Sequence, residues 1–117
     1  MTVTPDRYTT YRYAGASLDF NPIHLDDEFA RSVDLPSKIL HGLWTMAQVA
    51  RAQTEAVGDP LALKSLSVQF RGMGVPEKDI VITSKLASQA DGEAVVECEA
   101  VQDGNKLVRR GRAVLRL

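Results

Sequence analysis

One long helical segment, followed only by strand segments, is the feature that most restricts the fold of this 117-residue chain. From about His41 to Val57 the apolar side chains recur at helical spacing, and Gly58-Asp59-Pro60 is a stop signal. The positions that keep this spacing are Leu43, Met46, Ala47, Ala50, Thr54 and Val57. Because the first half of the segment is apolar on most sides, we expect the helix to be heavily buried.

Four strand candidates follow this helix. They are residues 61–70, 79–88, 94–101 and 106–117. Asp91-Gly92 and Asp103-Gly104-Asn105 separate the last three, and both are typical of hairpin turns. Helix and strands that are segregated along a chain indicate the α+β class. We therefore predict a single α+β domain, residues 1–117, in which a curved antiparallel sheet wraps the long helix.

The residues before the long helix predict a segment of short helices and loops. Thr4-Pro5-Asp6 indicates a helix start with Thr4 as the N-cap, and this helix is expected to run from Pro5 to about Ala14. Asn21-Pro22 disfavours helix and predicts a loop. The acidic residues at the start of 26–30 favour one or two further helical turns.

Composition excludes several classes of protein. The chain has 14 Lys and Arg against 15 Asp and Glu, which argues against a nucleic-acid partner. The single Cys98 excludes a disulfide framework, and with only two histidines no metal site is expected. No apolar run approaches the ~18 residues of a membrane span, and residues 1–6 do not resemble a signal peptide. We therefore expect a soluble, cytoplasmic protein with no membrane partner.

The two histidines are the first candidates for acid–base chemistry at neutral pH. Asp19 and His24 lie five residues apart in a loop tightened by Pro22, with Asn21 between them. A carboxylate beside an imidazole can share one water molecule, with one group removing a proton and the other delivering it. An ordinary turn explains Asp19 taken alone. The whole string Asp-x-Asn-Pro-x-His is expected by chance in well under ~1% of chains of this length.

Two segments carry a resemblance to a known family. Residues 13–26, followed by Phe29-Ala30, resemble the hydratase-2 motif of the MaoC-like dehydratases, which include (R)-specific enoyl-CoA hydratases and (3R)-hydroxyacyl-ACP dehydratases. Residues 40–46, with His41-Gly42, are similar to the His-Gly segment that opens the central helix of the family. The resemblance implies a hot-dog fold, in agreement with the architecture predicted from periodicity.

The resemblance also implies an activity and a site. Asp19 and His24 would be the catalytic pair that hydrates a trans-2-enoyl thioester to a (3R)-3-hydroxyacyl thioester, with Asn21 and Ser17 in supporting positions. The backbone N–H of Gly42 would bind the thioester carbonyl oxygen, where enolate charge develops. The implied reaction needs no cofactor, because CoA or acyl carrier protein (ACP) is part of the substrate.

The chain departs from the family in two places. Leu18 stands where the family usually has Gly, which permits backbone conformations that Leu resists. Relatives usually have an additional strand before the motif, whereas only residues 1–4 precede the first helix signal here. We therefore expect the sheet to lack that strand, and we expect a homodimer or heterodimer that covers the exposed apolar surface, with the acyl tunnel along the interface.

Other residues have two interpretations. His41 is a second acid or base, or more simply a structural residue that bonds the backbone or the motif loop. Four apolar residues either line an acyl tunnel or pack in the ordinary core: Phe20, Leu43, Trp44 and Met46. Cys98 is most simply a small buried side chain. The last strand contains the basic residues Arg109, Arg110 and Arg112, which either contact phosphates of the substrate carrier or belong to a solvated edge strand. A further arginine, Arg71, follows the first strand.

Two rival functions remain open at this point. The first is a hot-dog thioesterase, which usually has an Asp or Glu on or near the central helix; here the helix interior offers only Glu55, near its end. The second is a subunit of a heterodimeric dehydratase that needs a partner for activity. Retention of Asp19, Asn21 and His24 argues against an inert subunit, but not against a partner.

Overall fold

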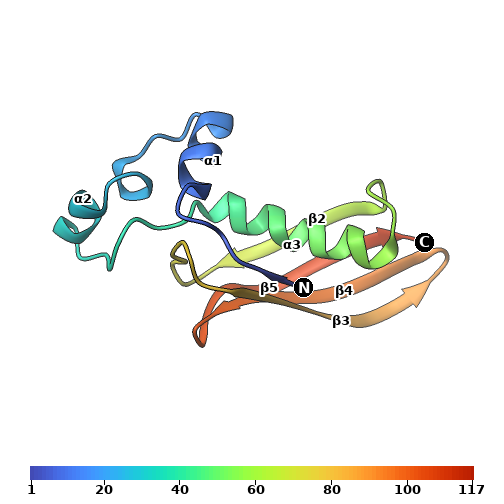
Figure 1. The fold of residues 1–117 in the computed structure, drawn as a ribbon. Helices are drawn as coiled ribbons and strands as arrows, with labels where there is room; N and C mark the ends of the chain where they lie inside the picture. Colours follow the sequence, from blue (N-terminus) through green and yellow to red (C-terminus); the bar gives the residue numbers. More distant parts are fainter.

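A five-stranded antiparallel sheet with one long helix across it forms the body of the molecule (Figure 1). We describe a computed structural model, which covers residues 1–117. The strand order is β1-β3-β4-β5-β2. The elements are β1 (Thr2–Val3), α1 (Thr9–Ser17), the 3-10 turn η1 (Pro22–His24), α2 (Asp27–Ser32), α3 (Gly42–Val57), β2 (Leu63–Phe70), β3 (Ile80–Ala90), β4 (Glu93–Gln102) and β5 (Asn105–Arg116). No helix is long and apolar enough to cross a membrane.

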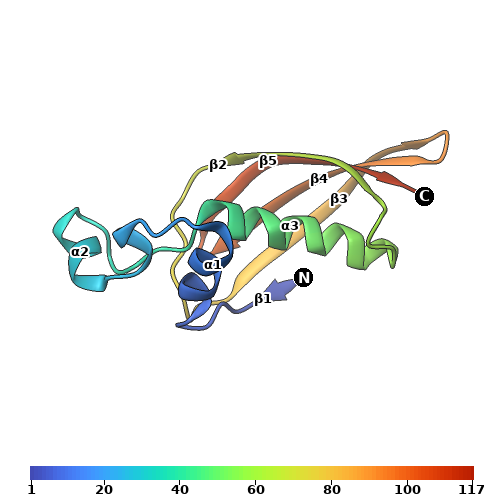
Figure 2. The same cartoon turned by 90° about the horizontal axis from the view of Figure 1, so that it is seen from above.

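The sheet curves around α3, while α1 lies beside the first turns of that helix and η1 and α2 lie beyond its N-terminal end (Figure 2). Val49 of α3 is fully buried against Ile80, Ala100 and Val108 of three strands. In β4, Val96, Cys98 and Ala100 face this core, as the strict alternation of the strand requires. The predicted α+β class and the predicted order of one helix followed by four strands are confirmed.

Both predicted hairpin turns are present. Asp91 and Gly92 have φ values of 54° and 75°, and Asp103 and Gly104 have φ values of 48° and 77°. Two successive residues with positive φ make the turn whose twist matches a β-hairpin, which explains why Gly takes the second place in each. These turns set the register of β3 with β4 and of β4 with β5.

Heavy burial of α3 is confirmed on one side only. The buried positions are Thr45, Val49, Ala52 and Gln53, which form one stripe of the helix. The apolar positions selected from the sequence lie elsewhere on the helix: Leu43 is 60% exposed and Val57 is 37% exposed. The sheet covers only one face of the helix, so the second apolar stripe has no partner within the chain.

The N-terminus differs from the prediction. The expected first helix is present but begins at Thr9 instead of Pro5, because Thr2 and Val3 pair with Val81 and Ile80 as strand β1 and the Thr4 hydroxyl bonds Asp79 rather than capping a helix. The sheet therefore has the N-terminal strand that we expected it to lack, although this strand is only two residues long.

Asp6, rather than Thr4, bonds the turn that leads into the first helix. Its carboxylate accepts from the Tyr8 N–H at 2.8 Å and pairs with Arg12 at 2.8 Å. The Arg12 guanidinium, followed by the Tyr8 N–H, holds the pKa of Asp6 below its ordinary value. Helix α1 then runs through Gly15 to Ser17.

Close packing of β4 on β5 makes a stability prediction. A Cβ added to Gly111 would lie 2.5 Å from the Cys98 carbonyl oxygen, whereas a Cβ on Gly15 would meet nothing within 4 Å. We expect Gly111→Ala to destabilise the fold by about 1–3 kcal/mol, the usual range for overpacking. Gly15→Ala is the matched control and is expected to stabilise α1 by up to about 1 kcal/mol. Urea unfolding of both variants tests this, and an unchanged midpoint for Gly111→Ala would contradict the described packing.

Candidate active site

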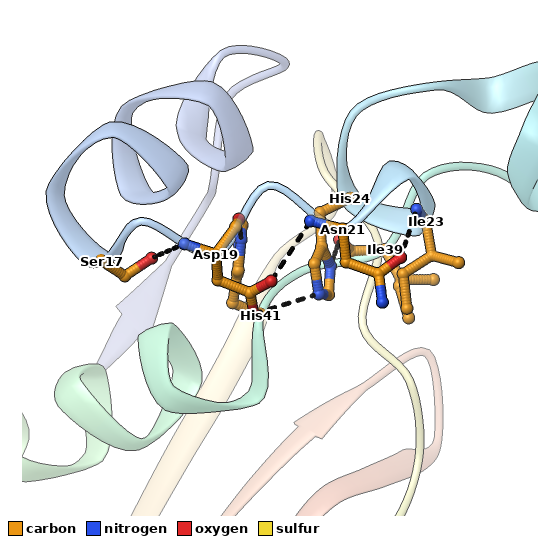
Figure 3. Close-up of polar contacts among 7 residues, drawn as sticks. All are labelled: Ser17, Asp19, Asn21, Ile23, His24, Ile39 and His41. Atoms are coloured by element: carbon orange, nitrogen blue, oxygen red, sulfur yellow. Dashed lines mark hydrogen bonds and ion pairs between the residues drawn. The ribbon is translucent and has the colours of Figure 1, made fainter.

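The loop between α1 and η1 is held by a chain of side-chain to backbone hydrogen bonds (Figure 3). The Asp19 N–H donates to Ser17 Oγ at 3.2 Å, and the Asn21 N–H donates to Asp19 Oδ1 at 3.2 Å. Asn21 Oδ1 in turn accepts from the Ile23 N–H at 3.1 Å, which starts η1. Small polar residues that bond the backbone two positions on are typical of such turns. The loop therefore holds its shape through its own sequence.

Asn21 acts on Asp19 through its backbone rather than its side chain. Its side-chain oxygen instead accepts from the Ile23 N–H and so satisfies a backbone group of the turn. Leu18, at the end of α1, adopts φ of +64°, the left-handed conformation that Gly adopts freely. The backbone thus has the glycine-like conformation here, at a cost of roughly 1–2 kcal/mol.

Asp19 and His24 face each other across a short gap (Figure 3). Asp19 Oδ2 lies 3.8 Å from His24 Nε2, which is too long for a direct hydrogen bond. The imidazole is 10% exposed and the carboxylate is 52% exposed, so one partner is fixed in the protein and the other reaches solvent. His24 Nδ1 lies 2.8 Å from the Ile39 carbonyl oxygen, which accepts its hydrogen. That bond leaves the Nε2 lone pair free on the side of Asp19.

His41 joins this loop to the start of α3. Its ring stacks on that of His24 with centroids 3.8 Å apart and an angle of 22° between the planes. Its Nε2 lies 3.0 Å from the Asp19 carbonyl oxygen and donates to it. The prediction that His41 bonds the motif loop is confirmed, and the residue contacts both members of the Asp19–His24 pair. Its buried Nδ1 has no protein partner.

The first N–H groups of α3 are free. Neither Gly42 nor Leu43 donates its backbone N–H to any group of the protein. Gly42 and His24 line the same cleft, which has a volume of about 220 Å³. A helix N-terminus carries partial positive charge, so an oxygen in this cleft that gains negative charge would be stabilised there.

None of the four residues proposed for an acyl tunnel lines this cleft. Phe20 is 57% exposed on the loop and Leu43 is 60% exposed on α3, while Trp44 lines a separate groove beside β1. Met46 is half-buried on α3 and is absent from the cleft wall.

The sequence analysis missed the residues that form the apolar wall of the cleft, which are Ile39, Leu40, Phe70, Met73 and Leu107. The Phe70 ring lies over Gly42, where an added Cβ would be 3.2 Å from it. The alternation of Leu66, Val68 and Phe70 in β2 was the one signal that could have found this wall, because it places these residues on the face toward α3.

The basic residues of β5 also lie away from the cleft. Arg109 donates to the Gln69 side chain. Arg110 and Arg112 line a shallow hollow of about 610 Å³ together with Glu97 and Glu99. Glu97 and Glu99 alternate with the core residues of β4, so this hollow is on the face of the sheet opposite α3. The structure does not bring these arginines to Asp19 and His24.

Asp19, His24 and His41 form the one grouping with the residue types of a metal site. Each offers one ligand atom, and these atoms lie within 4.8 Å of one another. The lone pairs of an imidazole lie in its ring plane, and the two rings here are stacked with their planes only 22° apart. Their lone pairs therefore do not converge on one ion, and the three residues do not fit a metal centre as they stand.

The hydrogen bonds assign opposite tautomers to the two histidines. We expect His24 to carry its hydrogen on Nδ1, which bonds Ile39, and neutral His41 to carry it on Nε2, which bonds Asp19. Long-range ¹H–¹⁵N NMR spectra of the imidazoles at a pH where both rings are neutral distinguish the two forms. Observation of the Nε2–H form of His24 would contradict the described site.

Comparisons with known proteins agree with this description. The family model for the MaoC like domain matches residues 1–106. Enoyl-CoA hydratase 2 of Arabidopsis thaliana is 33% identical over 96% of this chain, and a fatty acid synthase subunit beta of Aspergillus oryzae is 36% identical over 86% of it. The chain spans only 35% and 5% of those two proteins.

Solved structures show the same fold over the whole chain. A structure titled MaoC-like dehydratase superimposes with a TM-score of 0.94 and 28% identity, covering 100% of this chain and 38% of the other. The (R)-hydratase of A. caviae superimposes with a TM-score of 0.90 and 19% identity, covering 100% and 91%. The predicted hot-dog fold is confirmed. The chain belongs to the family of MaoC-like dehydratases.

Proposed function

We propose that this chain catalyses the reversible hydration of trans-2-enoyl thioesters to (3R)-3-hydroxyacyl thioesters. The observation that carries the proposal is the position of Asp19 and His24, which face each other across 3.8 Å at the N-terminal end of α3. The names of the enoyl-CoA hydratase 2 and fatty acid synthase relatives support it. The thioester would be carried by CoA or by an acyl carrier protein.

Asp19 Oδ2 and His24 Nε2 are both hydrogen-bond acceptors. A water molecule between them would therefore donate one hydrogen bond to each. In hydration its oxygen adds to C3 of the substrate, and one of its protons passes through the pair to C2. The electrons of the double bond move toward the thioester carbonyl, whose oxygen becomes negative. The free N–H of Gly42 donates to that oxygen and stabilises it. Dehydration runs through the same steps in reverse.

We propose that this reaction uses no metal and no cofactor beyond the carrier of the substrate. The stacking of His24 on His41 supports this proposal, since it turns their lone pairs away from a common point. The cytoplasmic location expected from the sequence stays a prediction.

The position of Glu55 disfavours the thioesterase alternative. It lies 13 residues beyond Gly42 on α3, which is roughly 20 Å along a helix. Its carboxylate is 59% exposed and pairs with Arg51 at 3.2 Å. Glu55 is therefore not placed to act on a thioester held at the N-terminal end of the helix.

Removal of either member of the pair tests the proposed function. We expect Asp19→Asn and His24→Gln each to lower kcat for hydration of crotonyl-CoA by roughly 100-fold or more, the usual contribution of a positioned acid or base. Asp34→Asn is the matched control, because Asp34 has φ of +67° outside the site and Asn tolerates that conformation. Full turnover in both site variants would contradict the proposal, and release of free CoA thiol by the wild type would favour the thioesterase.

We also propose that the chain works as a dimer with another hot-dog subunit, either a second copy or a related chain. One argument from the sequence is lost, because β1 is present. Two observations replace it: the outer edge of β2 is unpaired, and the stripe of Leu43, Ala47 and Val57 on α3 is exposed. A solved complex named ChsH1-ChsH2 from Mycobacterium tuberculosis has this fold, with a TM-score of 0.89 and 17% identity.

A charged residue introduced into the exposed stripe of α3 tests dimer assembly separately from folding. We expect Ala47→Glu to convert dimers to monomers, because the new carboxylate would be buried at the interface, and to keep the unfolding midpoint of the isolated subunit. Thr83→Glu, on the opposite face of the sheet, is the control and should stay dimeric. Sedimentation velocity measures both. A wild type that is monomeric and fully active at every concentration would contradict the dimer, whereas one that gains activity only with a partner chain would assign the heterodimer.

A further inference from the structure

The cleft beside His24 contains a single Lys, Arg, Asp or Glu residue. That residue is Arg71, which directly follows β2 and lines the cleft together with Gly42 and Phe70. No carboxylate lines the cleft with it. Arg71 is therefore the one cation that lines this cleft, with the Asp19 carboxylate outside the lining at 3.8 Å from His24 Nε2, whereas in the far-face hollow Arg110 and Arg112 are mixed with Glu97 and Glu99.

The Arg71 guanidinium has no partner in the protein. It makes none of the ion pairs, side-chain hydrogen bonds or cation–π contacts of the structure, and the residue is exposed. Most other cations of the chain are engaged: Arg12 with Asp6, Arg51 with Glu55, and Lys106 with Glu99. Arg71 is the cation of this cleft that is free to bind a ligand.

The backbone that carries Arg71 is fixed. Its N–H donates to the Leu107 carbonyl at 3.0 Å, and the N–H of Gly72 donates to the Lys106 carbonyl at 2.8 Å. A Cβ on Gly72 would lie 2.8 Å from the same Lys106 oxygen, so only Gly permits this approach to β5. The segment therefore presents the side chain from a defined place at the mouth of the cleft.

Large apolar side chains flank this cation. Phe70 is 49% exposed and Met73 is 59% exposed, and both line the cleft. The combination of an apolar wall, free N–H groups and one unpaired guanidinium matches a ligand with an apolar end, a carbonyl oxygen and an anionic end. An acyl thioester on a phosphopantetheine arm has all three. Arg is suited to the anionic end because its planar fork bonds a phosphate through two N–H groups.

We propose that Arg71 binds a phosphate of the substrate carrier, and that it, rather than the arginines of β5, determines carrier recognition. The proposal rests on the proposed thioester substrate. The shared chemistry is the 4′-phosphate of phosphopantetheine, which occurs in CoA and in a loaded acyl carrier protein; CoA also has nucleotide phosphates.

Three crotonyl thioesters separate these phosphates: crotonyl-pantetheine without phosphate, crotonyl-4′-phosphopantetheine and crotonyl-CoA. We expect Arg71→Ala to lower kcat/KM about tenfold for the phosphorylated substrates, mainly through KM, since a hydrogen bond to a charged group contributes about this much. It should leave crotonyl-pantetheine unchanged. A loss for both phosphorylated substrates assigns the shared phosphate, whereas a loss for crotonyl-CoA alone assigns the nucleotide phosphates.

Two further variants serve as controls. Arg71→Lys keeps the charge but not the fork and should retain part of the effect. Arg110→Ala removes an exposed arginine of the far face and should change nothing. An equal loss for crotonyl-pantetheine, or the same loss in Arg110→Ala, would overturn the proposal.

A binding measurement keeps this test independent of turnover. Calorimetry with 4′-phosphopantetheine and pantetheine should show that wild type prefers the phosphorylated ligand and that Arg71→Ala loses the preference. Equal binding of both ligands and of CoA by the wild type would overturn the phosphate site, even if hydration is confirmed. Phosphate-dependent binding in a wild type that hydrates none of the thioesters would overturn the proposed function and leave the phosphate site standing.

Discussion

The contact of His41 with the motif loop is the interaction on which the rest of the site depends. Its ring stacks on His24 at 3.8 Å, and its Nε2 bonds the Asp19 carbonyl at 3.0 Å. His41 is also the residue before Gly42, so a single side chain fixes both members of the pair relative to the free N–H groups of α3. The loop is on the outside of the body of the molecule, and without this contact its own turn hydrogen bonds and the bonds of Ile23 and His24 to Ile39 would hold it, none of which involves α3.

The uncovered face of α3 is the second constraint. A helix with apolar residues on several sides must bury each of those sides, and a single sheet buries only one of them. The N-terminal end of the same helix carries Gly42, so whatever covers the stripe of Leu43 and Ala47 lies next to the cleft. Assembly and substrate access would therefore be linked in this chain. Arg71, at the mouth of the cleft, remains exposed in the isolated subunit.

Much of this could be predicted from the sequence, because local signals and tertiary structure agree. The alternation in β4, the two turns with Gly at the second place and the Asp-x-Asn-Pro-x-His string each describe residues close together in the chain. The failures involve contacts between distant residues. Nothing near Thr2 and Val3 indicates that they pair with β3, and the helix-start signal at Thr4-Pro5 does not indicate that α1 begins only at Thr9. Phe70 reaches Gly42 only because β2 and α3 pack together.

The stereochemistry of addition tests the central claim most directly, because Asp19 and His24 lie on the same side of any substrate bound against Gly42. Hydration of crotonyl-CoA in deuterium oxide should give a (3R)-3-hydroxy product with one deuterium at C2, added to the same face as the new hydroxyl. NMR analysis of the product determines both centres. Addition of deuterium and hydroxyl to opposite faces would contradict the action of this pair on a single water molecule, and a (3S) product would contradict the proposed (3R) configuration.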